Sequence, residues 1–159
     1  MNADKYSTIS LLQILILIVI NISFSRVNAE VLDSVAVGVL VTNQGTDIVI
    51  PNNYTIVGND AFSGLSGLSS VAIPDSVTSV GAEAFSDCTG LTSITIGNSL
   101  SEIGESAFEG LVGLTSITIG NSVVSIGDRA FYNCGGLTGE SYLTRLPLLV
   151  LKPSLVVQD

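Results

Sequence analysis

The pair Ala-Phe recurs four times at a fixed interval of 23 residues, and this repeat constrains the fold more than any other feature of the chain. The phenylalanines of the four pairs are Phe62, Phe85, Phe108 and Phe131. A chain of 159 residues with five Phe does not acquire such spacing by chance. Periods of about 20 to 50 residues are typical of proteins that stack copies of one small unit. The sequence therefore predicts a repeat solenoid.

The repeats share apolar positions that indicate a short strand followed by turns. Counted from residue 45, each repeat has Ile or Val at its fourth and Ile at its sixth place, then Pro or Gly at the seventh. Alternating β-branched residues favour a strand, which Pro or Gly ends. More apolar residues follow at the tenth and thirteenth places. The fourteenth is always glycine, where we expect a positive φ, and Ala-Phe then lies in a short helical or 3₁₀ turn. The four repeats are 45–67, 68–90, 91–113 and 114–136.

A single coil of this kind cannot bury its own apolar side. We therefore expect the coils to stack, with parallel strands about 4.8 Å apart and a continuous core of aliphatic and Phe side chains. The Ser and Thr between the core positions would then form one outer sheet face.

The shared pattern is Leu-x-x-Ile-x-Ile-Pro/Gly-x-Ser-Val-x-x-Ile-Gly-x-x-Ala-Phe-x-x-Cys/Leu-x-Gly, and it resembles the BspA-like class of leucine-rich repeats. The pattern is clearest over 91–113 and 114–136, and the resemblance covers about 92 of the 159 residues. It implies a leucine-rich-repeat-type solenoid of about four full coils. It also implies a secreted or cell-surface protein, often adhesive or host-facing, although a repeat fold alone does not fix function.

Residues 1–29 differ from the repeats and predict a secretory signal peptide. An apolar run from Leu11 to Ile20 precedes the small-residue site Val27-Asn28-Ala29, so cleavage is expected after Ala29. The run is shorter than the roughly 20 residues that span a bilayer. The alternative is an uncleaved anchor that contacts the membrane through residues 7–24.

The two segments beside the repeats are interpreted as ends of the solenoid. Alternating valines over 31–44 predict a strand, so that 30–44 would form an amino-terminal cap. At the other end, 137–159 begins a partial fifth repeat and continues as an apolar tail with two prolines. We expect this tail to cover the last coil. The alternatives are a disordered end, or an end at which a longer array was cut.

Charge and composition exclude several function classes. The chain has 14 acidic and five basic residues, a net charge of −9 and no His. Nucleic-acid binding depends on Lys and Arg that neutralise phosphates, so we expect none. No recognisable nucleophile, base or cofactor motif is present. We therefore expect no catalysis, no cofactor and no small-molecule substrate.

Cys88 and Cys134 are interpreted as buried free thiols. They occupy a place that is Leu in the other two repeats, as a small buried hydrophobe would. They lie two coils apart, about 9 to 10 Å at strand spacing, which exceeds the reach of a disulfide. A disulfide or a catalytic pair is the less favoured reading.

Two further features have a functional and a structural interpretation. Asn53-Tyr54-Thr55 is a candidate glycosylation site, relevant only if the source is eukaryotic, and otherwise an unmodified turn. Four acids recur just before Ala-Phe, and they form either a calcium stripe or, as we favour, separate solvated acids that start each turn. These acids are Asp60, Glu83, Glu105 and Asp128.

The outward strand places form a flat, small and uncharged face apart from Asp47, and this is the candidate binding face. It lacks Tyr, Trp and Arg, the usual anchors of tight interfaces. The leading hypothesis is recognition of a protein or glycoprotein by a secreted or surface-displayed module. The alternative is a structural spacer, or a fragment of a longer array, with no specific ligand. The six candidate residues are Ser70, Ala72, Ser93, Thr95, Ser116 and Thr118.

Overall fold

The structure is a computed structural model that describes residues 31–137. The predicted signal peptide, its cleavage after Ala29 and the alternative anchor at 7–24 lie outside the described residues. The tail after Leu137 lies outside them too, and these predictions stand as they were.

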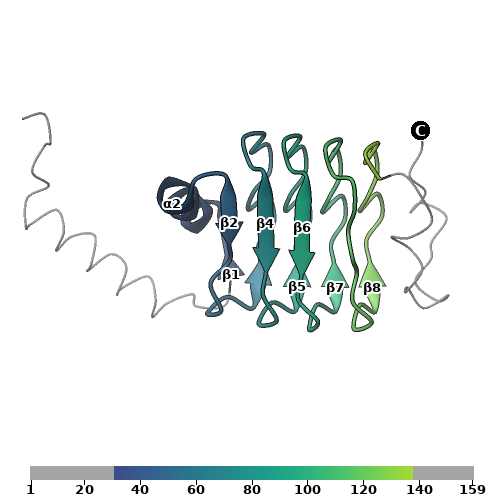
Figure 1. Cartoon of the computed structure of the whole chain (residues 1–159). Helices are drawn as coiled ribbons and strands as arrows, with labels where there is room; N and C mark the ends of the chain where they lie inside the picture. The colour runs from purple at the N-terminus through teal and green to yellow at the C-terminus, as the bar shows by residue number, and fades with distance from the viewer. Residues whose placement is uncertain (1–30, 138–159) are drawn as a thin grey trace, which may run out of the picture.

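The described chain winds into stacked coils that carry two parallel sheets (Figure 1). The first sheet has three strands, and the second has five, in which the strands are two residues long. The first contains β2 (Asp47–Val49), β4 (Ser70–Ile73) and β6 (Ser93–Ile96). The second contains β1 (Val31–Leu32), β3 (Ile56–Val57), β5 (Ser79–Val80), β7 (Glu102–Ile103) and β8 (Ser125–Ile126).

The strand register repeats the sequence period, which confirms the predicted solenoid. Ser70 pairs with Ser93, and Ser79 pairs with Glu102, so equivalent positions of adjacent coils lie side by side. In the fourth coil the first sheet continues only as a single bridge between Ile94 and Ile117. The second sheet was not predicted as a sheet, although its buried positions were among the predicted apolar places.

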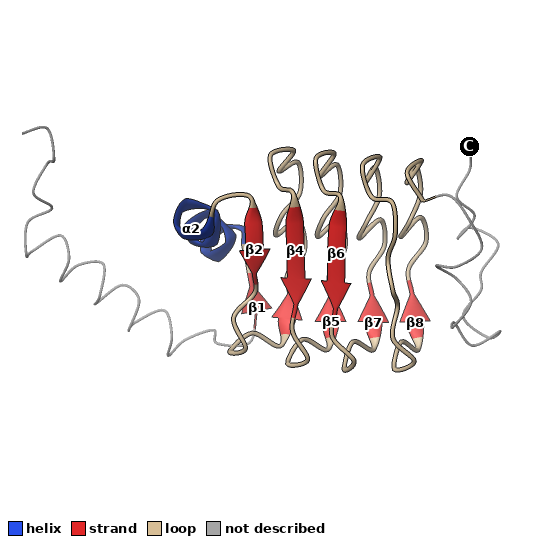
Figure 2. Ribbon diagram, viewed as in Figure 1, coloured by secondary structure: helices blue, strands red, loops and turns tan. Residues whose placement is uncertain are grey.

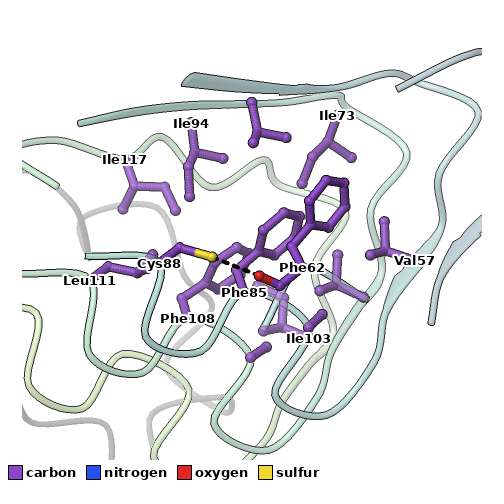
Figure 3. Close-up of a cluster of buried hydrophobic side chains, with 14 of the residues drawn as sticks. Val57, Phe62, Ile73, Phe85, Cys88, Ile94, Ile103, Phe108, Leu111 and Ile117 are labelled. Carbon is purple, nitrogen blue, oxygen red and sulfur yellow. Dashed lines mark hydrogen bonds between the residues drawn. The ribbon is translucent and has the colours of Figure 1, made fainter. Parts of the chain in front are cut away.

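A stack of Phe rings forms the centre of the core. The centroids of Phe62 and Phe85 lie 4.7 Å apart, and Phe108 follows at 5.4 Å with its ring nearly parallel to that of Phe85. Figure 3 shows these rings among aliphatic side chains, which include Val57 and Ile103 of the second sheet. All three Phe side chains have no exposed surface. The sequence period thus becomes a continuous buried column.

The Ala-Phe segments are hydrogen-bonded turns rather than helical turns (Figure 2). In each coil the sixteenth and twentieth residues have positive φ, for example Asp60 at 55° and Gly64 at 72°. Alternation of positive and negative φ directs every second N–H toward the next coil. Phe62 N–H accordingly donates to the carbonyl of Ala84 at 2.8 Å. A row of backbone hydrogen bonds therefore joins adjacent coils here, in addition to those of the two sheets, where a helical turn was expected.

The predicted strand over 31–44 is wrong beyond its first two residues, because the helix α2 (Ser34–Gln44) occupies most of it. Asp33 caps the helix by accepting a hydrogen bond from Ala36 N–H at 2.9 Å, and Gly45 ends it with a φ of 79°. Val37 is buried, whereas Val35 and Val39 are exposed. The alternating valines therefore lie on different sides of a helix, some buried and some exposed. The capping interactions at the two helix ends outweigh the preference of valine for strands.

Helix α2 lies beside β2 at the amino-terminal end of the described coils (Figure 1). The side chain of Gln44 bonds both backbone groups of Val49: Val49 N–H donates to Oε1 at 2.7 Å, and Nε2 donates to the Val49 carbonyl at 3.1 Å. Unpaired backbone groups at a sheet edge favour aggregation. Gln44 therefore occupies two of these groups on the open edge of β2.

Candidate binding face

The structure brings all six candidate residues onto the outer face of the first sheet. Ser70 and Ala72 lie on β4, where they pair with Ser93 and Thr95 of β6. Ser116 and Thr118 flank Ile117, which bridges to β6. The side chains at alternating strand positions point away from the core, because Val71, Ile94 and Ile117 between them are buried.

Hydroxyl groups dominate the exposed part of this face. Ser93, Thr95, Ser116 and Thr118 are exposed, whereas Ser70 and Ala72 are half-buried. The hydroxyl of Ser70 donates to Asp47 Oδ1 at 2.6 Å. The four exposed hydroxyls bond no partner within residues 31–137. The face can therefore form hydrogen bonds with a partner without first breaking bonds of its own.

An exposed apolar residue, Val49, lies at the edge of the face and adds apolar surface to it. Val49 pairs with Ala72 and has 61% of its surface exposed, the third-largest exposure among the large hydrophobic residues described. Together with Ala72 and the Thr methyl groups it adds apolar area beside the hydroxyls. Its outward place was evident from the repeat register, but its exposure could not be predicted because a neighbouring segment could have covered it.

The charges of the described repeats lie mainly on other surfaces. Residues 31–137 contain ten acidic side chains and a single basic one, Arg129. Arg129 bonds Glu109 at 2.5 Å, and its guanidinium lies 4.5 Å from the ring centroid of Tyr132. This cluster joins the third and fourth coils, and it was not predicted from the sequence. The residues are 20 positions apart, so the repeat register could have indicated their proximity.

The four acids before Ala-Phe are exposed. Within the described part of the chain, no group of three or more His, Cys, Asp or Glu side chains is arranged to hold a metal ion. Asp60 and Glu83 have positive φ, so these acids stand in the alternating turns rather than at the start of a helical turn. The helix-dipole explanation for them is therefore wrong.

Asn53 lies exposed in a tight turn that follows β2. The turn is closed by a hydrogen bond from Tyr54 N–H to the Pro51 carbonyl at 3.2 Å. An exposed turn is accessible to a glycosylating enzyme, and glycosylation of Asn53 stays a prediction. Within residues 31–137, no helix has the length and hydropathy needed to cross a bilayer.

Both cysteines are buried free thiols, which confirms the prediction. The thiol of Cys88 donates to the Phe62 carbonyl at 2.9 Å, as Figure 3 shows, and that of Cys134 donates to the Phe108 carbonyl at 3.0 Å. Burial raises the pKa of each thiol to about 11 from an ordinary 9.0. A neutral, hydrogen-bonded thiol is a poor nucleophile, so both side chains serve packing.

The raised thiol pKa values predict that stability falls in alkaline solution. Below pH 9 the thiols are protonated in both states. Between pH 9 and about 11 the unfolded chain loses protons that the folded chain retains, so the free energy of unfolding falls by about 1.4 kcal/mol per pH unit for each thiol. Urea denaturation at pH 8 and pH 10 under reducing conditions measures this fall.

The double variant Cys88→Ser, Cys134→Ser is the control for this measurement. Its hydroxyls do not ionise in this range. The variant should therefore lose less stability between pH 8 and pH 10. Equal losses in the two proteins would contradict the burial of protonated thiols.

Comparison with known proteins places the repeats in a described family. The BspA type leucine-rich repeat region matches residues 41–143 in six copies. The match covers more than half of the chain and includes all four predicted repeats. A search of curated proteins finds no match.

Solved structures with the same fold come from several bacteria. A leucine-rich repeat protein of T. pallidum is 35% identical, with a TM-score of 0.58. A leucine-rich cell surface protein of Faecalibacterium prausnitzii is 37% identical with a TM-score of 0.56. A leucine-rich repeat protein of Bacteroides capillosus is 32% identical with a TM-score of 0.51.

The matched regions are parts of these proteins. The similarity covers 58% of this chain with each of the first two structures, and 46% and 24% of those two chains, respectively. With the third structure it covers 55% of this chain and 70% of the other. The chain thus spans less than half of the length of the first two proteins.

Proposed function

The chain belongs to the BspA type leucine-rich repeat family, and from this premise we propose that it is a secreted or surface-displayed module that binds a protein or glycoprotein without catalysis. The observation that carries the proposal is the flat outer face of the first sheet. There, four exposed hydroxyl side chains in two coils have no partner within the described residues. Solenoid sheets of this type offer extended surfaces to partners.

The chemistry of the face favours many weak contacts over one tight one. It has no Trp, Tyr or Arg, which supply most of the energy of tight interfaces. Ser and Thr hydroxyls both donate and accept hydrogen bonds, and so suit peptide groups and sugar hydroxyls equally. Several copies of such a face would act together through multivalency, as adhesion requires.

Localisation outside the cell or on its surface is part of the proposal. The predicted signal peptide supports export, and the uncleaved anchor at 7–24 would instead hold the module at a membrane. One similar structure carries the name of a cell surface protein. Mass spectrometry of the mature amino terminus distinguishes the two forms, because cleavage after Ala29 leaves Glu30 as the first residue.

A second candidate function is a structural spacer with no ligand of its own. It is favoured by the small share that the matched region occupies in the first two similar structures, 46% and 24%. In an array longer than this one, most coils would only set the distance between binding sites. A spacer would tolerate charged substitutions on the face.

We expect the double variant Ser93→Glu, Ser116→Glu to reduce binding to immobilised extracellular matrix and cell-surface glycoprotein at least about tenfold. Two unpaired carboxylates in the middle of an interface lose solvation on binding and repel acidic partners. The measurement is saturable binding of the intact protein, followed by surface plasmon resonance at constant salt.

The matched control places the same two charges in the same two coils but outside the face. Ser99 and Ser122 are exposed in the turns that follow the outer strand segments of these coils, so Ser99→Glu, Ser122→Glu adds equal charge and leaves the face intact. The proposal requires that only the first variant loses affinity. Equal affinity of both variants, or no saturable binding by the unmodified protein, would favour the spacer.

A further inference from the structure

Helix α2 has an outward side that no part of the described chain covers. Val37 faces the core, whereas Val35 and Val39 lie on the opposite side of the helix with 64% and 50% of their surfaces exposed. Gly38 and Thr42 are also exposed on that side, because residues three, four and seven positions apart share one side of a helix. A Cβ on Gly38 would meet nothing within 4 Å. We call these four exposed residues the outward stripe of α2.

The outward stripe has no charge and needs no hydrogen bond from outside. The whole helix contains no Asp, Glu, Lys or Arg, although the chain carries a net charge of −9. The hydroxyl of Thr42 donates to the Gly38 carbonyl at 2.8 Å. From Val35 to Val41 the helix is apolar on all sides, and such helices are normally buried. The stripe is therefore suited to a dry contact with another apolar surface.

The occupant that fits the stripe is a second copy of it. Two uncharged stripes meet across a two-fold axis without bringing like charges together, whereas the exposed acids of the described coils would repel their counterparts. Helices that lie on membrane surfaces carry Lys and Arg on their polar side, and α2 has neither. The predicted cleavage after Ala29 would remove the apolar run at 11–20 from the mature chain.

We propose that the protein forms a symmetric dimer through the outward stripe of α2. The contact is small, because a helix of 11 residues is only about 16 Å long. Two such helices bury less than the roughly 1,200 Å² of a stable standard interface. The dimer is therefore weak, with a dissociation constant of about 10 to 100 µM, and it forms where the chains are concentrated.

Dimerisation through α2 leaves both outer faces of the first sheet free. The helix lies beside β2 at the amino-terminal end of the coils (Figure 1), while the four exposed hydroxyl residues belong to the third and fourth coils. Two weak binding faces in one particle bind a repeated ligand more tightly than one face does, through effective concentration. This consequence rests on the proposed function, but the dimer itself does not.

Sedimentation velocity of the mature protein, without any ligand, measures the association. Over a range of about 5 to 500 µM, the weight-average mass should rise toward twice that of the monomer. Both copies are acidic, so raising NaCl from about 0.05 to 0.5 M screens their repulsion and should strengthen the dimer severalfold. A protein that stays monomeric at the highest concentration overturns the proposal, whether residues 1–29 of an uncleaved chain cover the stripe or leave it open.

Val39→Glu and Val124→Glu form a matched pair of variants. Val39→Glu brings two carboxylates together in the middle of the contact and should weaken the dimer at least about tenfold, and Val35→Glu should act in the same way. Val124 is 69% exposed in the fourth coil, so Val124→Glu adds the same charge away from α2 and should associate as the unmodified protein does. All three sites are exposed, so thermal denaturation of the variants should change little. Equal association of the Val39 and Val124 variants would assign the dimer to another surface and overturn the proposal.

Discussion

Phe85→Ala is expected to lower the free energy of unfolding by about 4 to 5 kcal/mol. Truncation of a buried Phe costs about 3 to 5 kcal/mol in lost burial and cavity formation. Phe85 also loses two ring contacts, with centroids 4.7 Å from Phe62 and 5.4 Å from Phe108, and each such contact contributes about 0.5 to 1.5 kcal/mol. Urea denaturation followed by circular dichroism measures the change.

The control for Phe85 is Tyr132→Ala. Tyr132 is 38% exposed and contacts Arg129 at the surface, so its truncation should cost about 1 kcal/mol or less. A domain of this size is stable by only about 5 to 15 kcal/mol, so Phe85→Ala should lose the cooperative transition near 37 °C while Tyr132→Ala keeps it. Similar costs for both variants would contradict a continuous Phe column.

The core of this fold could be predicted because the repeat fixes which places are buried. A position that carries Ile, Val or Phe at every interval of 23 residues must face other copies of itself in a stack, whatever the local conformation. The residues at these places, such as Ile48, Val71 and Phe108, are accordingly buried. Burial follows from the period and does not depend on identifying each strand or turn.

Local conformation was harder to predict where few residues define an element. The strands of the second sheet are two residues long, and a pair such as Ser79–Val80 is too short to show alternation. Helix α2 was missed because its valines alternate, while the residues that decide the outcome are the caps Asp33 and Gly45. Capping bonds of this kind outweigh the small differences in intrinsic propensity.

The residues that form the candidate binding face could be predicted from the sequence, but the ligand that the face would select could not. The register of β4 and β6 places the Ser and Thr residues together once the strands are identified. A face of hydroxyls and methyl groups, however, carries no charge pattern or anchor that selects one partner. The exposure of Val49 was equally beyond prediction, because it depends on how α2 lies beside the first strand.

The glycine at the fourteenth place shows how a correct position can have a different physical cause. We expected positive φ there, but Gly104 has none, and positive φ occurs instead at residues such as Asp60 and Ser106. What Gly104 provides is close approach. A Cβ on it would lie 2.5 Å from the carbonyl carbon of Gly81 and 2.6 Å from the backbone nitrogen of Ala82. The spacing between coils at this point requires the absence of a side chain.

Gly104→Ala is therefore expected to destabilise the protein by about 3 kcal/mol or more, since the atoms that must move are backbone and cannot shift without separating two coils. Gly38→Ala is the control: nothing lies within 4 Å of its Cβ position in α2, so it should stabilise by about 0.5 to 1 kcal/mol. Thermal and urea denaturation measure both.

Substitution by asparagine distinguishes a glycine that is required for its positive φ from one that is required because there is no space for a side chain. Asn tolerates positive φ better than Ala, so a glycine needed for φ accepts Asn more readily. Gly64, with a φ of 72° and open space around it, should show this order, with Asn less costly than Ala. At Gly104 the larger side chain should be at least as costly as Ala, because space and not φ is limiting. If Gly104→Asn proved milder than Gly104→Ala, the close approach of the coils would not be what selects glycine there.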